Sequence, residues 1–356
     1  MRVSIGVMVA SVMVLGGGTA LAQTPESAGP DTESESVATV LGEPVAPVEG
    51  AGSADILLLL VFGLLSAGSI VAVRRFALLR ARDGAVARYD ALERAMLPAT
   101  PGGPVRNIGL LLVLGSMGLW LASGMMGSIP IALATEPGGQ PPATVGMTAA
   151  SLGAMVAGCV VLFGASWALW PRLGGALGLP RSTGELGRDL KLGAIALGLT
   201  LPVVLLLAVV VGLVMNWLAS MGVVERPDAL AHETLRQLAA GEKDGAWWAV
   251  IGLVVLGVPL AEELIYRGLM QTGLRTGLGV GETRRGRGLD WIAVGMTGLI
   301  FAFVHLGTAD THSLVILFAL ALAMGVAYER TGRLMVPIVM HAGFNGVNIL
   351  IAQVGA

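Results

Sequence analysis

The sequence predicts an all-α fold, a polytopic bundle of membrane helices, and two observations support this prediction. Hydrophobic residues make up 54% of the 356 residues, whereas charged residues make up only 13%. A soluble domain of this length lacks the interior volume to bury so much apolar surface. The hydrophobic residues also cluster in runs of membrane-spanning length. We therefore expect about eight transmembrane helices after an N-terminal signal peptide.

Residues 1–22 resemble a signal peptide. Arg2 precedes an apolar stretch, and Ala20-Leu21-Ala22 forms a small-x-small cleavage pattern. We expect cleavage near Ala22, with an uncleaved anchor as the alternative. Residues 23–53 contain six acidic residues, four prolines and no basic residue. Because this composition is too poor in apolar side chains to fold, residues 23–54 are predicted to be a disordered, acidic extracytoplasmic tether.

Eight apolar runs follow the tether, and each is long enough to cross a bilayer as a helix. The runs cover approximately residues 55–73, 107–127, 147–170, 192–216, 247–270, 291–307, 313–329 and 334–354.

The loops between these runs alternate in charge. Residues 74–94 contain six arginines, and residues 171–191 and 275–287 contain four basic residues each, whereas residues 128–146 contain none. Because basic loops stay in the cytoplasm, the pattern predicts a mature N-terminus and a C-terminus that are both extracytoplasmic. With the signal peptide, it indicates a multi-pass protein of a bacterial plasma (inner) membrane. Topology explains the basic residues, so we expect no nucleic-acid partner.

Ionisable residues within the predicted spans are concentrated in the second half of the chain. Such groups cost several kcal/mol at membrane depth unless they are paired or hydrated, so they indicate a functional site. We therefore divide the chain into N-terminal transmembrane helices, residues 55–220, and a catalytic transmembrane core, residues 245–356. The core's spans contain Glu262, Glu263, Arg267, His305 and His341.

The stretch "AEELIYRGLM" places three of these groups directly after the uncharged run Trp247–Ala261. Glu263 and Arg267 are four residues apart, so their side chains meet on one helical face in the favourable order. Glu262 lies about 100° around the helix and is not aimed at Arg267 in the same way. A snorkelling ion pair at a helix end explains Glu263 and Arg267, but it leaves the second carboxylate unexplained. Glu262 is therefore the candidate for chemistry.

Two histidine motifs accompany the glutamates. "FAFVH" places Phe301 and His305 on one face of the sixth predicted span, and "HAGFN" places His341 and Asn345 on one face of the eighth. A lone histidine on an apolar helix is usually a hydrogen-bonded core residue. Together with Glu262, however, these residues form a minimal set for activating water, namely a carboxylate base, an imidazole and donors for an oxyanion.

Other arrangements are less well supported. The sequence contains no HExxH, GxSxG or Walker motif. Glu262, His305 and His341 form an alternative two-histidine, one-carboxylate zinc site. His232 and His312 are predicted to lie in outside loops, with no part in the site.

The stretches "EELIYRG", "FAFVH" and "HAGFN" resemble the EExxxR, FxxxH and HxxxN motifs of the CPBP family. This family includes type II CAAX prenyl endopeptidases and bacterial proteins linked to bacteriocin processing and immunity. The motifs stand in the family's order, and the resemblance covers about residues 245–352. Long described as metalloproteases, the family is better described as glutamate-dependent intramembrane proteases. The resemblance therefore implies that no cofactor is required, with zinc as the alternative.

The resemblance also implies a role for each motif residue. Glu262 and His305 would activate the attacking water. His341 and Asn345 would position the substrate carbonyl and stabilise the oxyanion. Glu263 and Arg267 would hold the site together, and Phe301 is the remaining supporting residue.

The expected function is that of an intramembrane endopeptidase that cuts membrane-associated peptides or membrane proteins within the lipid bilayer. For a bacterium, membrane-proximal peptides, leader peptides and anchored regulators are the expected substrates. The alternative is a non-catalytic bacteriocin-immunity or membrane scaffold protein of the same fold. An ion-coupled transporter would also place carboxylates and histidines in the membrane, but the sequence lacks the repeated halves typical of that class.

Overall fold

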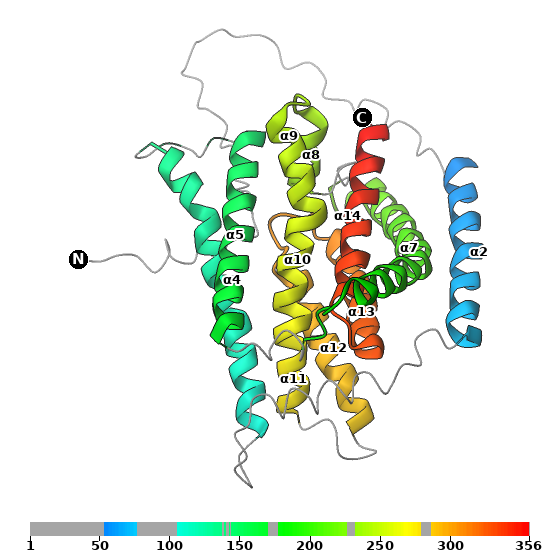
Figure 1. The fold of residues 1–356 in the computed structure, drawn as a ribbon. Helices are drawn as coiled ribbons and strands as arrows, with labels where there is room; N and C mark the ends of the chain where they lie inside the picture. The colour runs from blue at the N-terminus through cyan, green and yellow to red at the C-terminus, as the bar shows by residue number, and fades with distance from the viewer. Residues whose placement is uncertain are drawn as a thin grey trace.

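The computed structural model describes residues 53–76, 105–136, 139, 142, 144–169, 177–225, 232–278 and 286–355. Every regular element within these ranges is a helix (Figure 1), which confirms the predicted all-α class. The predicted signal peptide and nearly all of the acidic tether lie outside the described residues, so both stay predictions.

Eleven α-helices and two π-helical segments make up the described part of the chain. They are α2 (Ser53–Phe76), α4 (Val105–Ala134), α5 (Val145–Leu169), α7 (Thr183–Ser220), α8 (Glu233–Ala240), α9 (Gly245–Gly252), η1 (Leu253–Gly257), α10 (Val258–Glu263), η2 (Leu264–Gln271), α11 (Thr272–Gly277), α12 (Gly286–Phe303), α13 (Ser313–Thr331) and α14 (Met335–Gly355).

Six of the described helices are long and apolar enough to cross a membrane. Two other predicted spans correspond to shorter apolar helices, so the predicted count of eight is not confirmed, although each predicted run overlaps a helix. The shorter helices are Leu59–Val71 and Trp291–Phe303. The six candidate spans are Gly109–Ala134, Val145–Leu169, Thr183–Ser220, Gly245–Gly277, Ser313–Thr331 and Met335–Gln353.

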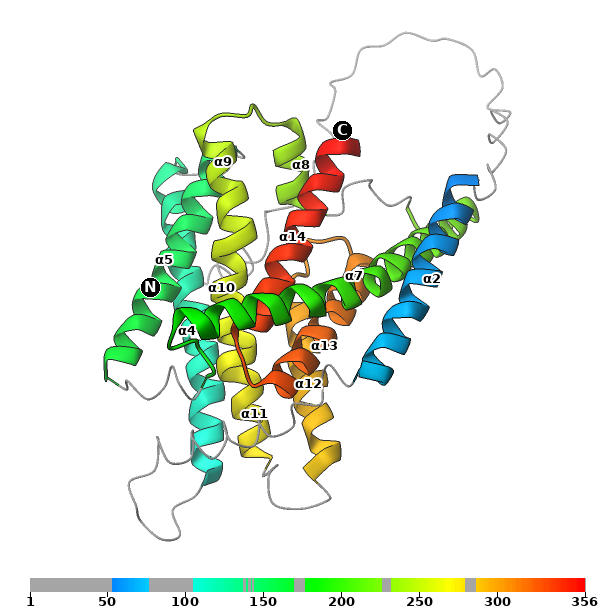
Figure 2. The same ribbon diagram turned by 45° about the vertical axis from the view of Figure 1, so that its right-hand side comes forward.

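The continuous helix from α9 to α11 stands beside α4 and α5 on one side of the bundle. Helix α14 packs against α7 and α13, while α12 packs against α13. Helix α7 crosses the bundle obliquely and also contacts α2 (Figure 2). The short helix α8 lies at the end of the bundle that also carries the C-terminal end of α14. The two halves of the sequence are thus packed into one bundle around the central helix.

Helix α7 begins well before the apolar run that predicted it. The run starts at residue 192, but the helix starts at Thr183 and is capped by Ser182, whose side chain accepts from the Glu185 N–H. Asp189 Oδ1 and Glu185 Oε2 accept hydrogen bonds from Arg333 at 2.6 and 3.2 Å. These acidic residues suit the first turns of a helix, and Arg333 ties this end of α7 to the α13–α14 connection.

Several of the largest fully buried side chains lie where η2, α12, α13 and α14 meet. They include Tyr266, Phe301, Tyr328 and Met340. The Tyr328 hydroxyl donates to the carbonyl of Leu177, 3.2 Å away, and so joins the segment before α7 to this core. This packing holds the two motif histidines near the helix that carries the glutamates.

Candidate active site

The helix that carries the glutamates is interrupted by a π-helical segment on each side of them. In η1, the N–H of Val258 bonds to the carbonyl of Leu253, five residues earlier. The next residue, Pro259, has no N–H to donate. The carbonyl of Val254 is therefore left without a partner on its own helix, and it accepts instead from Asn345 Nδ2 at 2.9 Å. Pi-helical turns of this kind are frequent at functional sites.

Glu263 and Arg267 form the ion pair that their spacing predicted. Arg267 Nη1 donates to Glu263 Oε1 at 3.0 Å, and both side chains are fully buried. The guanidinium also donates to the carbonyl of Ala321 at 3.1 Å and lies over the Phe301 ring, 4.9 Å from its centroid. A charge at this depth is tolerable only with such partners. The pair thus connects the glutamate helix to α12 and α13.

His341 extends this network from α14. Its Nδ1 lies 3.0 Å from Glu263 Oε1, and its side chain is only 6% exposed. A carboxylate paired with arginine can only accept, so Nδ1 must carry the proton. In the neutral ring, Nε2 therefore presents a lone pair, which faces Glu262 Oε2 at 3.8 Å.

His305 lies beyond the end of its helix, so the prediction that the helix extends through residue 307 is wrong. Helix α12 ends at Phe303, and His305 stands in the following turn, where its backbone N–H bonds to the carbonyl of Ala302 at 3.1 Å. Gly307, with φ of 92°, lets the chain turn there. The predicted neighbour Phe301 still lies against the imidazole, with ring centroids 4.8 Å apart.

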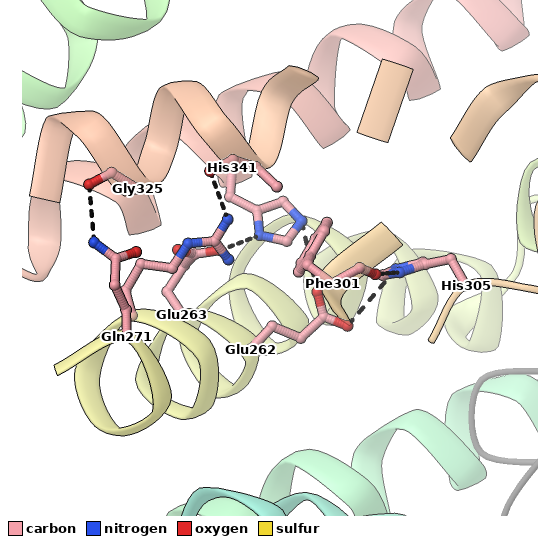
Figure 3. A network of polar contacts seen from close by, with 9 residues as sticks. Glu262, Glu263, Gln271, Phe301, His305, Gly325 and His341 are labelled. Carbon is pink, nitrogen blue, oxygen red and sulfur yellow. Dashed lines mark hydrogen bonds and ion pairs between the residues drawn. The ribbon is translucent and has the colours of Figure 1, made fainter. Parts of the chain in front are cut away.

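The tautomer of His305 follows from the same argument as that of His341. Its Nδ1 lies 2.7 Å from the carbonyl of Phe301, and a carbonyl can only accept. The neutral ring therefore presents a lone pair at Nε2, 3.9 Å from Glu262 Oε1. Phe301 lies between the two histidine rings and separates them (Figure 3).

Glu262 is the point on which both imidazoles converge. Figure 3 shows its carboxylate pointing toward His305 and His341. Both nitrogen-to-oxygen separations exceed the 2.7–3.2 Å of a direct hydrogen bond. Glu262 Oε2 is buried and has no hydrogen-bond partner among the described residues. A buried carboxylate oxygen in that state is suited to binding a small polar molecule.

These side chains open onto a cavity of about 640 Å³. All four residues predicted to be catalytic, Glu262, His305, His341 and Asn345, line it. The helices that precede the matched motifs, α4, α5 and α7, supply another part of the cavity wall. Apolar side chains of that wall include Ile131, Met147, Leu152, Met155, Val204 and Leu205.

The cavity also contains a histidine that the sequence analysis excluded. His232 lies in the connection before α8, outside every motif, yet it lines the same cavity as His305. Its Nδ1 caps α8 by accepting from the Thr234 N–H at 3.2 Å. The only sequence signal was a polar residue at a helix start, which predicts a cap rather than a site. His312, in contrast, is not among the residues that line this cavity.

The alternative zinc site is not supported by the geometry. Tetrahedral zinc ligands at 2.0–2.1 Å from the metal lie about 3.3 Å from one another. The separations from Glu262 to His305 and His341 are 3.9 and 3.8 Å. No group of three or more His, Cys, Asp or Glu side chains within the described ranges is arranged to hold a metal ion. These separations are about 0.5 Å longer than those of bound zinc ligands, and metal dependence stays a question for experiment.

Comparison with known families agrees with the motifs. Residues 244–347 match the family model described as type II CAAX prenyl endopeptidase Rce1-like. The matched segment runs from the start of α9 into α14 and contains all three motifs, which confirms the resemblance to the CPBP family. No curated protein and no solved structure matches the chain. This segment is therefore similar to type II CAAX prenyl endopeptidases, within a chain whose apolar helices fit a multi-pass membrane protein.

Proposed function

We propose that the protein is an intramembrane endopeptidase that hydrolyses peptide bonds of membrane-associated substrates. The observation that carries this proposal is the convergence of two imidazole nitrogens on the carboxylate of Glu262, at 3.9 and 3.8 Å, inside one cavity. The family match of residues 244–347 supports the same reaction class.

Glu262 and His305 are the two groups proposed to bind and activate the attacking water. Both groups present acceptors, since the carboxylate has lone pairs and the His305 proton is on Nδ1. A water oxygen placed about 2.8 Å from both Glu262 Oε1 and His305 Nε2 would make an angle of about 90° with these two atoms. This is close to the angle between the two O–H bonds of water. Both hydrogens are then engaged, and the oxygen lone pairs are left to attack a carbonyl carbon.

The reaction balances with Glu262 as the proton carrier. The carboxylate takes a proton from the water as the new carbon–oxygen bond forms, giving a tetrahedral oxyanion. Glu262 then returns that proton to the amide nitrogen as the carbon–nitrogen bond breaks. The products are a carboxyl group and an amine, as hydrolysis requires. General acid–base catalysis of this kind contributes about 10²–10⁴-fold to the rate.

Asn345 and His341 are the proposed oxyanion donors. The Asn345 amide has two N–H groups, of which one bonds to Val254, and no hydrogen bond among the described residues uses the other. His341 can donate from Nε2 only as an imidazolium, because its Nδ1 proton faces Glu263. That carboxylate supports the charged ring, as a buried carboxylate does for the histidine of a catalytic triad.

The proposed substrate is a peptide segment that carries apolar side chains. The cavity joins the polar cluster to a largely apolar wall from α4, α5 and α7. Such a wall favours apolar side chains, which a membrane-proximal or membrane-anchored peptide provides.

The proposal is tested with the full chain, purified and placed in lipid nanodiscs, and a quenched fluorescent peptide library. We expect cleavage by the wild type, and a loss of about 10²–10⁴-fold in Glu262→Gln, Glu262→Ala and His305→Ala. Glu136→Gln, which changes an exposed glutamate outside the cavity, serves as the control and should cleave normally. Equal activity in the Glu262 variants would contradict the proposal. The alternative function, a non-catalytic membrane scaffold, would then remain. In that case Glu262→Gln should still bind its partner.

A further inference from the structure

We infer that His232 is a substrate-binding residue whose Nε2–H donates a hydrogen bond to a backbone carbonyl of the peptide in the cavity. This inference rests on the proposed function, because it names a contact with the substrate of that same site. His232 lies before the segment that matches the family model, so no motif assigns it a role.

The proton of His232 is held on Nε2, the ring nitrogen that does not cap α8. The backbone N–H of Thr234 can only donate, and it points at His232 Nδ1 from 3.2 Å. That nitrogen must therefore be unprotonated, and the neutral ring carries its hydrogen on Nε2. His305 and His341 have the opposite tautomer, with protonated Nδ1 and a lone pair at Nε2.

The cavity needs donors of this kind. In their neutral forms, His305 and His341 present acceptors, and the carboxylate of Glu262 adds more. A peptide that enters the cavity brings carbonyl oxygens that have lost their water and require donors. Among the cavity histidines, His232 alone presents a donor in its neutral form. It therefore offers a donor to a further backbone carbonyl of the substrate, besides the carbonyl that Asn345 and His341 are proposed to hold.

The surroundings of His232 keep the ring neutral. Burial, together with the nearby His305 and Arg236, lowers the pKa of His232 to about 4. Near neutral pH the ring is therefore an uncharged donor. Arg236 lies 3.9 Å from the carboxylate of Asp310, so its charge is held beside the turn that follows His305.

The backbone fixes His232 relative to His305. His232 forms an antiparallel bridge with Ala309, and the N–H of Ala309 bonds to the carbonyl of His305 at 3.0 Å. On its other side, His232 begins α8 as the N-cap residue. Both attachments restrict the ring, so the donor loses little conformational freedom when a substrate binds.

Two substitutions separate the cap from the donor. In His232→Asn, the side-chain oxygen takes the place of Nδ1 and still accepts from Thr234, but no donor remains at the position of Nε2. In His232→Gln, the amide nitrogen reaches the position of Nε2, whereas glutamine is a poor N-cap. His232→Ala removes both functions. His312→Asn is the matched control, because His312 does not line the cavity.

The experiment measures kcat and KM in nanodiscs for the library peptide that the wild type cleaves best. We expect KM to rise about tenfold in His232→Asn and His232→Ala, with kcat within about twofold, since one hydrogen bond is lost from binding. The KM of His232→Gln should stay close to the wild-type value. The KM and kcat of His312→Asn should equal those of the wild type. Thermal unfolding of each variant checks that the helices remain folded.

The following outcomes overturn the inference. A normal KM in His232→Asn together with a raised KM in His232→Gln assigns the residue to capping alone. A normal KM in all His232 variants removes it from the substrate site. If no cleavage depends on Glu262, the proposed function fails and this inference fails with it. Normal cleavage with an unchanged KM in His232→Asn overturns the inference alone.

Discussion

The side-chain amide of Asn345 donates to the carbonyl of Val254 at 2.9 Å, across 91 residues of sequence. That carbonyl is available because Val258 bonds to Leu253 and because Pro259 has no N–H. The amide is therefore anchored to the glutamate helix itself, little more than two turns before Glu262. This contact fixes the second N–H of Asn345 relative to the carboxylate that is proposed to activate water.

The first prediction concerns Asn345 as an oxyanion donor. Asn345→Ala should lower kcat by about 10²–10³-fold with little change in KM, because the donor acts mainly on the developing charge. Gln353→Ala is the control. It removes a similar contact from the same helix, the 3.3 Å bond from Gln353 to the Leu238 carbonyl, away from the cavity. Equal loss of kcat in both variants would assign Asn345 to stability alone.

The second prediction follows from Pro259. Pro259→Ala supplies an N–H that can bond to the carbonyl of Val254, so it competes with Asn345 for that acceptor. We expect the unfolding temperature to rise or stay unchanged, since a proline inside a helix is unfavourable, while kcat falls about tenfold through the displaced amide. Pro202→Ala in α7 is the control, because it also removes a proline inside a helix. A normal kcat in Pro259→Ala would contradict the proposal that residue 259 and Asn345 compete for the Val254 carbonyl.

The third prediction concerns the buried ion pair. Arg267→Leu should lower the free energy of unfolding by about 3–5 kcal/mol, because it leaves Glu263 charged and buried without its partner. Glu263→Gln, Arg267→Leu should be less destabilised than the sum of the single changes. Asp310→Asn is the comparison, since its ion pair with Arg236 is partly exposed and contributes about 0–1 kcal/mol. Thermal unfolding in nanodiscs compares the two single variants, the double variant and Asp310→Asn with the wild type. Additive losses in the double variant would contradict the pairing.

Contacts set by helix geometry were predictable from the sequence. The pairing of Glu263 with Arg267 follows from a spacing of four, because such side chains meet on one helical face. Phe301 and His305 are also four apart, and their rings lie 4.8 Å from each other even though the helix ends between them. The helical class followed from apolar runs, each of which overlaps a helix.

Features that depend on backbone irregularity or on distant packing were not predictable. The end of α12 at Phe303 is set by the turn at Gly307, which a hydrophobic run does not reveal. The π-helical segment before Glu262 depends on which carbonyls other helices satisfy, and here Asn345 satisfies one. His232 reaches the cavity only through its bridge to Ala309, a contact between segments that share no periodic pattern.

The fourth prediction concerns metal. Because the proposed mechanism activates water with Glu262 and His305 and needs no metal, we expect cleavage to survive EDTA treatment. We also expect the active protein to contain less than one zinc per chain by mass spectrometry. Loss of activity with EDTA, followed by recovery with added zinc, would contradict this. It would instead support the alternative set Glu262, His305 and His341. Unfolding temperatures with and without EDTA distinguish loss of a catalytic ion from general destabilisation.

The fifth prediction concerns pH and the cap of α8. Burial, together with His305 and Arg236, lowers the pKa of His232 to about 4, whereas a histidine in the unfolded chain titrates near 6.5. Between these values the unfolded state binds more protons than the folded state. The stabilisation from the neutral ring is therefore complete above about pH 6.5 and is lost as the pH falls through about 4. Protonation of Nδ1 would also remove the acceptor of the Thr234 N–H, and with it the side-chain cap of α8.

Hydrogen exchange of the α8 amides, corrected for the intrinsic pH dependence of exchange, measures this loss. We expect protection of Glu233–Ala240 to decrease between about pH 6.5 and 4 in the wild type. His232→Asn keeps an acceptor for Thr234 but has no titrating group, so its protection should stay level over the same range. Helix α5 serves as the internal reference, because it does not contain His232. An equal decrease in the wild type and in His232→Asn would show that another group controls α8, since only the wild-type ring can gain a proton at this position.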